Sequence, residues 1–466
     1  MKTARIRNLL LTTGAVALLS LQPVAGFAES LTDALIKAYQ TSPVLASGRA
    51  GLRSLDESVP IARSTKRPQV DANIGAGTSA DYGDFDDSRS DYLQATLDAS
   101  LIVFDSGQTQ AAIESARNDV AAGRADLKGI EQTVLYDAVQ AYVDVRRDEE
   151  FVKLARADVD RLEETLRATR NRFEVGEVTR TDVSQSEARL AESRATLAVT
   201  SGQLQISREA YRAAIGNAPN NLENLPPKPD LPATLSEAEA VAMQNNPDLI
   251  SAQFSERVAV YDFDRALAAK RPTVQVGAST GLSRSTNSLG SFGGDPFAEL
   301  SVSGNMPLYT GGRNDSLIRQ AQALIDQRRF QVQETGRLVR ENVAAAWAQY
   351  EAAGVTIIAT REQAEASRIA AEGVAEEARL GARSTLEVLD ADQDRLEAEA
   401  QIVEAIRTEY LAAYALLQAM GLLTVEHLNL GIETYDPDIN FARVQDGPIG
   451  GYDTSVVDRI RSRWEQ

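Results

Sequence analysis

Two carboxylates, those of Glu387 and Asp390, are the first candidates for functional groups in this chain. They lie three residues apart, just after a short polar bend around Gly381, and the segments on both sides have the pattern of long helices. Side chains at this spacing share one face of a helix, so the two charges are expected to act together. Acidic residues are also common in the first turn of a helix, where they balance its dipole. The residues alone favour this second, structural interpretation.

The bend has a second copy because the chain is an internal duplication. Phe173–Gln185 repeats its pattern about two hundred residues earlier, and Arg67-Pro68 and Arg271-Pro272 are separated by nearly the same offset. Each repeat is predicted to contain two short helices, two strands, a long helix and a further helix. The expected division is a signal peptide at 1–28, a first repeat at 29–216, a connector at 217–234, a second repeat at 235–421 and a tail at 422–466.

The predicted strands alternate between apolar and polar residues. Val70, Ala72 and Ile74 fall on one face, and Asp71 and Asn73 fall on the other. This period of two is typical of a sheet with one apolar and one polar face. A soluble core beneath the sheet is one interpretation, but the helices have apolar seams of their own and leave no separate layer to cover it. The four predicted strands are 68–80, 91–104, 272–284 and 297–309.

The long helices are marked by heptad repeats. Leu389, Leu396 and Val403, for example, recur every seven residues after the second bend. Sustained heptads indicate coiled-coil packing. A helix from Ser106 to Asn171 would be about 100 Å long at roughly 1.5 Å per residue, which indicates an extended molecule rather than a compact domain.

The composition disfavours several kinds of chemistry. With no cysteine and one histidine, the chain lacks the usual ligands of thiolate and zinc sites, and a net charge of −19 disfavours nucleic acid as a partner. No residues have the spacing of a catalytic, metal or cofactor site, so neither an enzyme nor a cofactor is predicted. Lys2, Arg5 and Arg7, followed by an apolar run, indicate a secretory signal peptide.

Four strands are too few to close a membrane barrel, since such barrels start at about eight strands. Open sheet edges are not tolerated in lipid, because their backbone groups would lack hydrogen-bond partners. Strands that span a membrane would therefore have to come from several chains. Their polar face would then line a water-filled passage, which the helices would continue as a tube.

These features, in this order, resemble the outer-membrane efflux (TolC-like) channel family over nearly all of residues 30–421. The marks are the duplication, an Arg-Pro pair before each first strand, the strand exit at 104–107 and, most specific, the segment GARSTLEVLDA at 381–391. The resemblance implies a mainly α fold with a small β part. In it, three chains form one twelve-stranded barrel in the outer membrane of a Gram-negative bacterium and a tunnel of coiled-coil hairpins in the periplasm.

The resemblance also implies how the other segments are placed. The shorter helices, predicted at 43–66 and 182–215, would stack end to end beside the long helix of the first repeat. The connector and the tail would form a belt around the middle of the tunnel.

Residues near the two bends take on roles by the same resemblance. Glu387 and Asp390 would form an acidic ring at the narrow periplasmic entrance, which reverses the preference for a purely structural role. Arg383 matches the family's latch arginine, with Thr181 and Asp182 as its partners on the neighbouring hairpin, although Asp182 also suits a helix cap. The predicted contacts for a periplasmic adaptor protein are the two hairpin tips, Val175, Gly176, Glu177, Leu380, Gly381 and Ala382.

The predicted function is a passive exit duct for an efflux or type I secretion system. It would work as a homotrimer, surrounded by outer-membrane lipid and joined to a periplasmic adaptor and an inner-membrane pump. The alternative is a periplasmic coiled-coil adaptor or structural protein in which the sheet is a soluble head. A duct would depend on detergent and form heat-resistant trimers, whereas an adaptor would be soluble without detergent.

Overall fold

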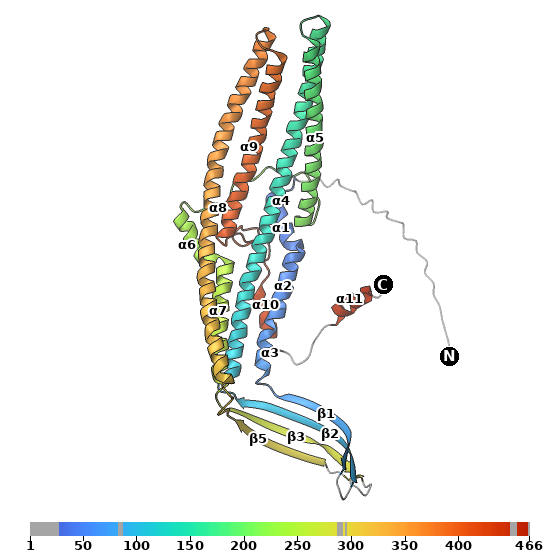
Figure 1. Ribbon diagram of the computed structural model, residues 1–466, viewed down its shortest axis with the longest axis vertical. Helices are drawn as coiled ribbons and strands as arrows, with labels where there is room; N and C mark the ends of the chain where they lie inside the picture. Colours follow the sequence, from blue (N-terminus) through green and yellow to red (C-terminus); the bar gives the residue numbers. More distant parts are fainter. Residues whose placement is uncertain (1–27, 83–86, 287–291, 294–295, 448–453, 465–466) are drawn as a thin grey trace, which may run out of the picture.

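The computed structural model describes residues 28–82, 87–286, 292–293, 296–447 and 454–464. The predicted signal peptide at 1–28 therefore lies outside the described residues, apart from Ala28. Figure 1 shows an elongated molecule in which long helices end in a small sheet on one side and in two hairpin tips on the other. This mainly helical architecture confirms the predicted fold class for a single chain.

Both repeats follow the predicted order of elements, with one additional helix in the first and one additional short strand in the second. The first consists of α1 (Leu31–Thr41), α2 (Pro43–Asp56), α3 (Ser58–Ser64), β1 (Gln69–Tyr82), β2 (Asp87–Phe104), α4 (Gln108–Glu174) and α5 (Arg180–Ile215). The second consists of α6 (Leu235–Asn245), α7 (Pro247–Ala268), β3 (Thr273–Thr286), the short β4 (Phe292–Gly293), β5 (Pro296–Asn305), α8 (Arg313–Arg379) and α9 (Thr385–Ala419). The tail adds α10 (Pro437–Val444) and α11 (Ser455–Trp464).

The two long helices, α4 and α8, form the axis of the molecule. Each has 67 residues and is therefore about 100 Å long. Toward the tips α4 pairs with α5 and α8 pairs with α9, whereas toward the sheet α2, α3 and α7 pack beside them (Figure 1). The shorter helices thus follow one another along the long ones, and the predicted coiled-coil hairpins are confirmed.

Prolines account for the ends of several helices. Pro247 occupies the first turn of α7, where a missing N–H costs nothing. The single helix predicted at 43–66 is wrong, because the chain breaks at Glu57 between α2 and α3. Pro60 explains the break, since it has no N–H to donate to the carbonyl of Asp56.

The sheet joins the strands of both repeats in the order β1-β2-β3-β5, with antiparallel neighbours. Its register places apolar residues opposite one another. Ile74 faces Ala95, and Ala95 faces Leu282 on the other side. On the opposite face Tyr92 is paired with Gly77, and its ring covers the glycine so closely that an added Cβ would lie 2.5 Å from it. The predicted alternation of two faces is therefore built into the pairing.

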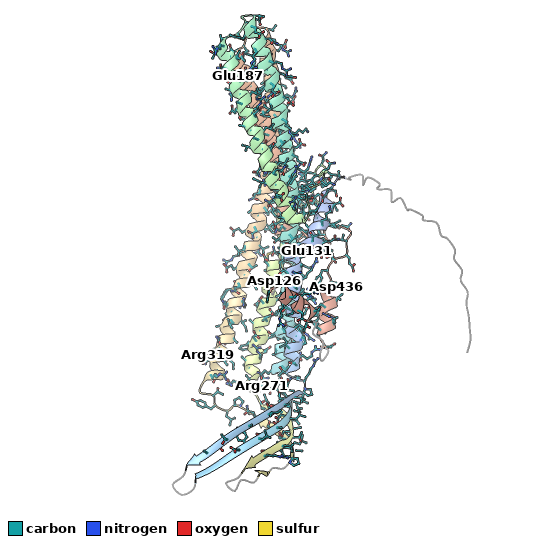
Figure 2. All side chains as sticks on the ribbon, turned by 90° about the vertical axis from the view of Figure 1, so that its right-hand side faces the viewer. Asp126, Glu131, Glu187, Arg271, Arg319 and Asp436 are labelled. Atoms are coloured by element: carbon teal, nitrogen blue, oxygen red, sulfur yellow. The ribbon has the colours of Figure 1, made fainter. Side chains whose placement is uncertain are left out.

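Two strand boundaries differ from the prediction by four residues, and the others lie within two residues of it. β2 begins at Asp87 rather than at 91, and β5 ends at Asn305 rather than at 309. Pro307 accounts for the early end of β5, because proline cannot donate to a strand ladder. Figure 2 shows Arg271, just before β3, at the junction where the helices meet the sheet.

The apolar face of the sheet has no covering layer in the described part of the chain. Ile74, Leu300 and Val302 are 84%, 77% and 70% exposed, although they lie in the middle of strands. A contiguous apolar surface of this kind marks an interaction site rather than a finished exterior. The sheet is therefore not the lid of a core within this chain.

The main hydrophobic core lies at the waist, where α1, α4 and α8 meet the ends of α5 and α9. The fully buried Tyr142 sits there, with its hydroxyl 3.0 Å and 2.8 Å from the carbonyl oxygens of Glu29 and Glu223. The connector is thus tied to α4, while its proposed place in a belt stays a prediction. None of the helices in the described ranges combines the length and apolar character that crossing a bilayer requires.

Candidate functional site at the hairpin tips

The two hairpin tips are built in the same way. α4 ends at Glu174 and is followed by Gly176 with a φ of +82°, whereas α8 ends at Arg379 and is followed by Gly381 with a φ of +81°. These left-handed conformations favour glycine, which has no Cβ to clash with the backbone. The duplication of the sequence is therefore preserved in the backbone of both tips.

Asp182 and Glu387 occupy equivalent positions just after the tips. The hydroxyl of Thr179 caps α5, and the carboxylate of Asp182 accepts a hydrogen bond from the backbone N–H of Thr179 at 2.8 Å. In the same way Ser384 caps α9, and Glu387 accepts from the N–H of Ser384 at 2.8 Å. Such reciprocal capping boxes fix the first turn of a helix. The caps are therefore Thr179 and Ser384, and the two carboxylates complete their capping boxes.

The caps also keep these two groups charged. Hydrogen bonds from the Ser384 N–H, the Arg383 guanidinium and the Ser384 hydroxyl lower the pKa of Glu387 from 4.5 to about 2. The hydroxyl and N–H of Thr179 lower the pKa of Asp182 as well. Each hairpin tip thus has a carboxylate that stays ionised in mildly acidic solution.

Arg383, the predicted latch arginine, is held within its own hairpin. Its Nε donates to Glu377 at 2.7 Å and its Nη1 donates to Glu387 at 2.8 Å. The predicted partners lie on the other hairpin, where Thr181 is exposed and Asp182 completes the capping box of α5. Among the hydrogen bonds and ion pairs of the described residues, none joins Arg383 to Asp182 within one chain. A latch between neighbouring chains stays a prediction.

Asp390 links the two hairpins to each other. Its carboxylate accepts a hydrogen bond from Arg189 of α5 at 2.8 Å. The adjacent Leu389 is buried against Leu162 and Leu190, in a small apolar cluster shared by α4, α5 and α9. Glu387 and Asp390 are thus brought close together as predicted from their spacing, but each is paired with an arginine of the same chain.

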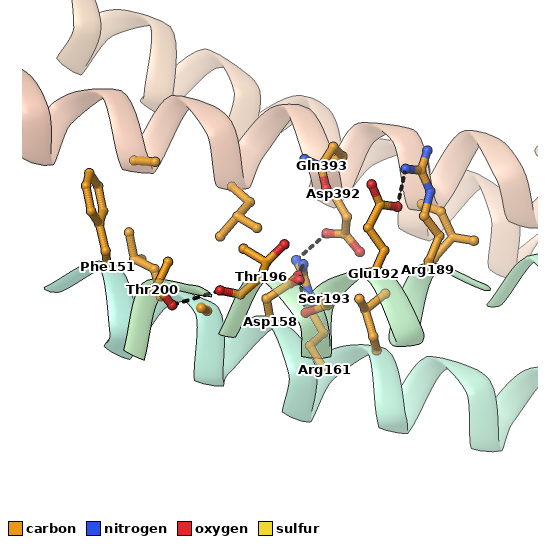
Figure 3. A pocket seen from close by; sticks show the side chains of 16 residues that line it. Phe151, Asp158, Arg161, Arg189, Glu192, Ser193, Thr196, Thr200, Asp392 and Gln393 are labelled. Carbon is orange, nitrogen blue, oxygen red and sulfur yellow. Dashed lines mark hydrogen bonds and ion pairs between the residues drawn. The ribbon is translucent and has the colours of Figure 1, made fainter. Parts of the chain in front are cut away.

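A second link between the hairpins lies farther from the tips, and Figure 3 shows it in close-up. Arg161 of α4 donates a hydrogen bond from one nitrogen to Asp392 of α9. A second nitrogen of Arg161 donates to Asp158 at 2.6 Å. Ser193 of α5 donates to the second oxygen of Asp158 at 2.6 Å. These four residues, here called the Arg161 cluster, line a cavity of about 150 Å³. Burial raises the pKa of Asp392, and Arg161 opposes this effect.

The sequence reasoning missed both links between the hairpins. α4, α5 and α9 have many charged residues, and spacing alone does not show which of them meet across two hairpins. The sequence offered one signal, because Asp158 is a charged residue beside Val159 in the apolar seam of α4. In the structure Asp158 is almost fully buried. Within the described ranges, no group of histidine, cysteine or acidic residues has the geometry to hold a metal ion.

Comparison with known proteins decides the family. The family model described as "Outer membrane efflux protein" matches residues 34–217 and 240–422. The chain belongs to this family. It is 34% identical over 436 residues to the outer membrane efflux protein BepC of Brucella suis biovar 1 (strain 1330), which covers 91% of this chain and 92% of the relative. It is 25% identical over 419 residues to the outer membrane protein TolC of Vibrio cholerae serotype O1, which covers 88% and 95%.

A solved structure shows the same fold. The Campylobacter jejuni CmeC outer membrane channel matches with a TM-score of 0.74 and 14% identity, covering 95% of this chain and 98% of that one. Family membership confirms the predicted outer-membrane location and the predicted role in efflux. The hairpin tips and the uncovered sheet are therefore the two ends of an efflux protein.

Proposed function

We propose that three copies of this chain join their sheets into one twelve-stranded barrel in the outer membrane and their hairpins into a tunnel through the periplasm. The assembly would be the passive exit duct of a tripartite efflux or type I secretion system. A periplasmic adaptor would join it to an inner-membrane pump, which supplies the energy. The duct itself performs no chemical step.

The uncovered apolar face of the sheet is the observation that supports this proposal most. Four antiparallel strands present exposed apolar side chains such as Ile74 and Leu300 on one face and polar side chains on the other. In lipid, the outer strands β1 and β5 need partners for their free backbone groups. Neighbouring copies supply these partners and leave the apolar face toward lipid.

The tips support the contact with an adaptor. Val175 and Leu380 hold equivalent positions beside the two glycines and are 71% and 80% exposed. Around Gly176 and Gly381 nothing lies within 4 Å of the place where a Cβ would be, so another chain can approach the backbone closely.

Leu380→Asp is expected to reduce crosslinking and co-purification of the adaptor. Ile369→Asp, which replaces an exposed apolar residue elsewhere on α8, is the matched control and is expected to leave it unchanged.

At the entrance, the acidic ring and the latch form the gate of the proposed duct. Arg383 uses only part of its hydrogen-bonding capacity within its own chain, and the rest is free to reach Thr181 or Asp182 of a neighbouring copy.

Arg383→Ala is expected to raise the single-channel conductance in planar bilayers. The control is Arg379→Ala, which removes an arginine of the same hairpin that pairs with Glu376. Equal conductance of wild type and Arg383→Ala would count against the latch.

The alternative, a soluble periplasmic adaptor or structural protein, makes the opposite prediction for the whole molecule. The duct is expected to require detergent, to migrate as a heat-resistant trimer and to conduct ions in planar bilayers. A detergent-independent monomer without conductance would favour the alternative.

A further inference from the structure

The C-terminal helix α11 differs in charge and exposure from the rest of the chain. It has three arginines, Arg459, Arg461 and Arg463, against one acidic residue, Asp458, in a protein whose net charge is −19. Figure 1 shows it standing clear of the long helices. Every described side chain of α11 is exposed, including Trp464.

The apolar residues of α11 form one stripe. Val457, Ile460 and Trp464 follow one another at intervals of three and four residues, which places them on the same face of a helix. Arg461 and Arg463 fall on the two sides of this stripe. A helix with this arrangement lies flat at a membrane surface, with its apolar stripe in the acyl boundary and its arginines at the lipid phosphates.

The segment before α11 is fixed at the junction between helices and sheet. Asp446 pairs with Arg63, and its carbonyl oxygen accepts from Arg67 at 2.7 Å. Gly447 packs against Arg67, only two residues before β1 begins. If the sheet spans the outer membrane, as proposed above, this junction lies at the periplasmic surface of that membrane.

The chain between these points is long enough for α11 to reach that surface. Seven peptide steps separate Gly447 from Thr454, the residue before α11, and they span up to about 23 Å when extended. At that surface, acidic lipid headgroups complement the charge of the arginines. The apolar stripe and Trp464 would pack at the boundary between the headgroups and the acyl chains.

We propose that α11 binds the periplasmic leaflet of the outer membrane as an amphipathic anchor, with anionic phospholipid as its partner. It would hold each copy of the chain at the foot of the proposed barrel. This inference rests on the proposed function, because it requires the sheet to lie in the membrane. It adds a lipid contact made by the tail.

The test uses the fluorescence of Trp464 in the full-length trimer. The chain has two tryptophans, so Trp347→Phe leaves Trp464 as the single reporter. The protein is reconstituted in vesicles of phosphatidylcholine, with or without phosphatidylglycerol, whose acyl chains are brominated. We expect the brominated lipid to quench Trp464 strongly in the anionic vesicles and more weakly in the neutral ones.

Charge variants on the same background separate this contact from general proximity to the bilayer. Arg461→Gln and Arg463→Gln are each expected to lower the ratio of lipid-bound to free α11 about fivefold in anionic vesicles. Asp458→Asn lies on the face opposite the stripe and is the matched control, expected to show no loss.

Two results would overturn the anchor. Trp464 could stay equally accessible to aqueous acrylamide in detergent and in both kinds of vesicle, or it could be protected from acrylamide without being quenched by lipid, which would show that α11 packs on protein. Conductance of the same preparation in planar bilayers distinguishes the two proposals. A conducting channel with either result refutes the anchor alone, whereas a chain that neither inserts nor conducts refutes both.

Discussion

At the hairpin tips, Asp182 and Glu387 have a structural role that the proposed gate would also use. Each closes a capping box on a serine or threonine, so its presence is explained by local helix stability alone. The same hydrogen bonds keep the carboxylate ionised, which an acidic ring at a channel entrance requires. The observed capping role is therefore compatible with the acidic ring proposed for Glu387.

The charge of Glu387 is expected to persist in acid. Its pKa is lowered from 4.5 to about 2, so its contribution to helix stability is fully present above pH 4.5 and is lost as the pH falls from there through about 2. In the proposed duct, the difference in cation preference between wild type and Glu387→Gln should be the same at about pH 7 and pH 5. Reversal potentials in a salt gradient measure it, and a difference that vanishes at the lower pH would contradict the pKa assignment.

The Arg161 cluster is expected to couple the two hairpins energetically. Arg161→Gln removes the cation that the half-buried Asp392 and the buried Asp158 share. Among the described residues it leaves Asp392 only Arg395, at 3.8 Å. It should destabilise the folded chain by about 2 kcal/mol. Combining it with Asp392→Asn should restore part of this loss, because the pair is then removed together. Denaturant unfolding of the two single variants and the double variant gives the coupling, and strictly additive losses would show that the pair is not coupled.

Spacing in the sequence located the tip residues but not their partners. Gly381, Glu387 and Asp390 were predicted at the bend because turn and capping signals are local. The pairs Arg189–Asp390 and Arg161–Asp392 join residues about two hundred positions apart, and they form only when two hairpins pack. With 48 basic and 67 acidic residues in the chain, sequence alone offers too many possible pairs to choose between.

Among the elements, the tip turns depend on glycine in a way that can be measured. Gly381→Ala forces a side chain into a left-handed conformation, which costs about 1–2 kcal/mol. The amide of Ala382, which donates to the Glu377 carbonyl at 2.9 Å, should then exchange with solvent about five to thirty times faster. Gly373→Ala, inside α8 and with nothing within 4 Å of its Cβ position, is the control and should not speed this exchange. Unchanged exchange in Gly381→Ala would contradict the turn.

Long elements were predicted better than short ones. Heptads and alternating strands carry many consistent residues, so the extent of α4 and α8 and the two faces of the sheet follow from pattern alone. The break at Glu57 and the end of β5 depend on single prolines, Pro60 and Pro307. Strand ends also depend on how far the pairing continues, which a single strand does not encode.

For the whole molecule, the sequence correctly indicated an extended helical body and a sheet without cover. It indicated assembly only indirectly. The backbone N–H and C=O groups at the two edges of a four-stranded sheet would have no hydrogen-bond partners in lipid. In the proposed assembly the missing part of the architecture belongs to other copies of the chain, and no pattern within one copy specifies their number. The proposed trimer therefore rests on the family and on the shape of the single chain.

Substitutions on the two faces of the sheet should differ in effect. Leu300→Arg places a charge on the proposed lipid face and should destabilise the membrane-inserted form by about 2–4 kcal/mol. Gln275→Arg places the same charge on the polar face of β3 and should be tolerated. The yield of heat-resistant trimer in outer-membrane fractions compares the two, and equal yields would contradict the assignment of the faces.

The most direct test of the central claim is the accessibility of single spin-labelled cysteines along β5 in reconstituted trimers. The chain has no cysteine of its own, so each of positions 298 to 303 can be labelled alone. If the apolar face of β5 meets lipid, labels at 298, 300 and 302 collide with oxygen dissolved in lipid, and labels at 299, 301 and 303 collide with a water-soluble nickel reagent. Labels at 298, 300 and 302 that are accessible only from water, or from neither phase, would contradict it.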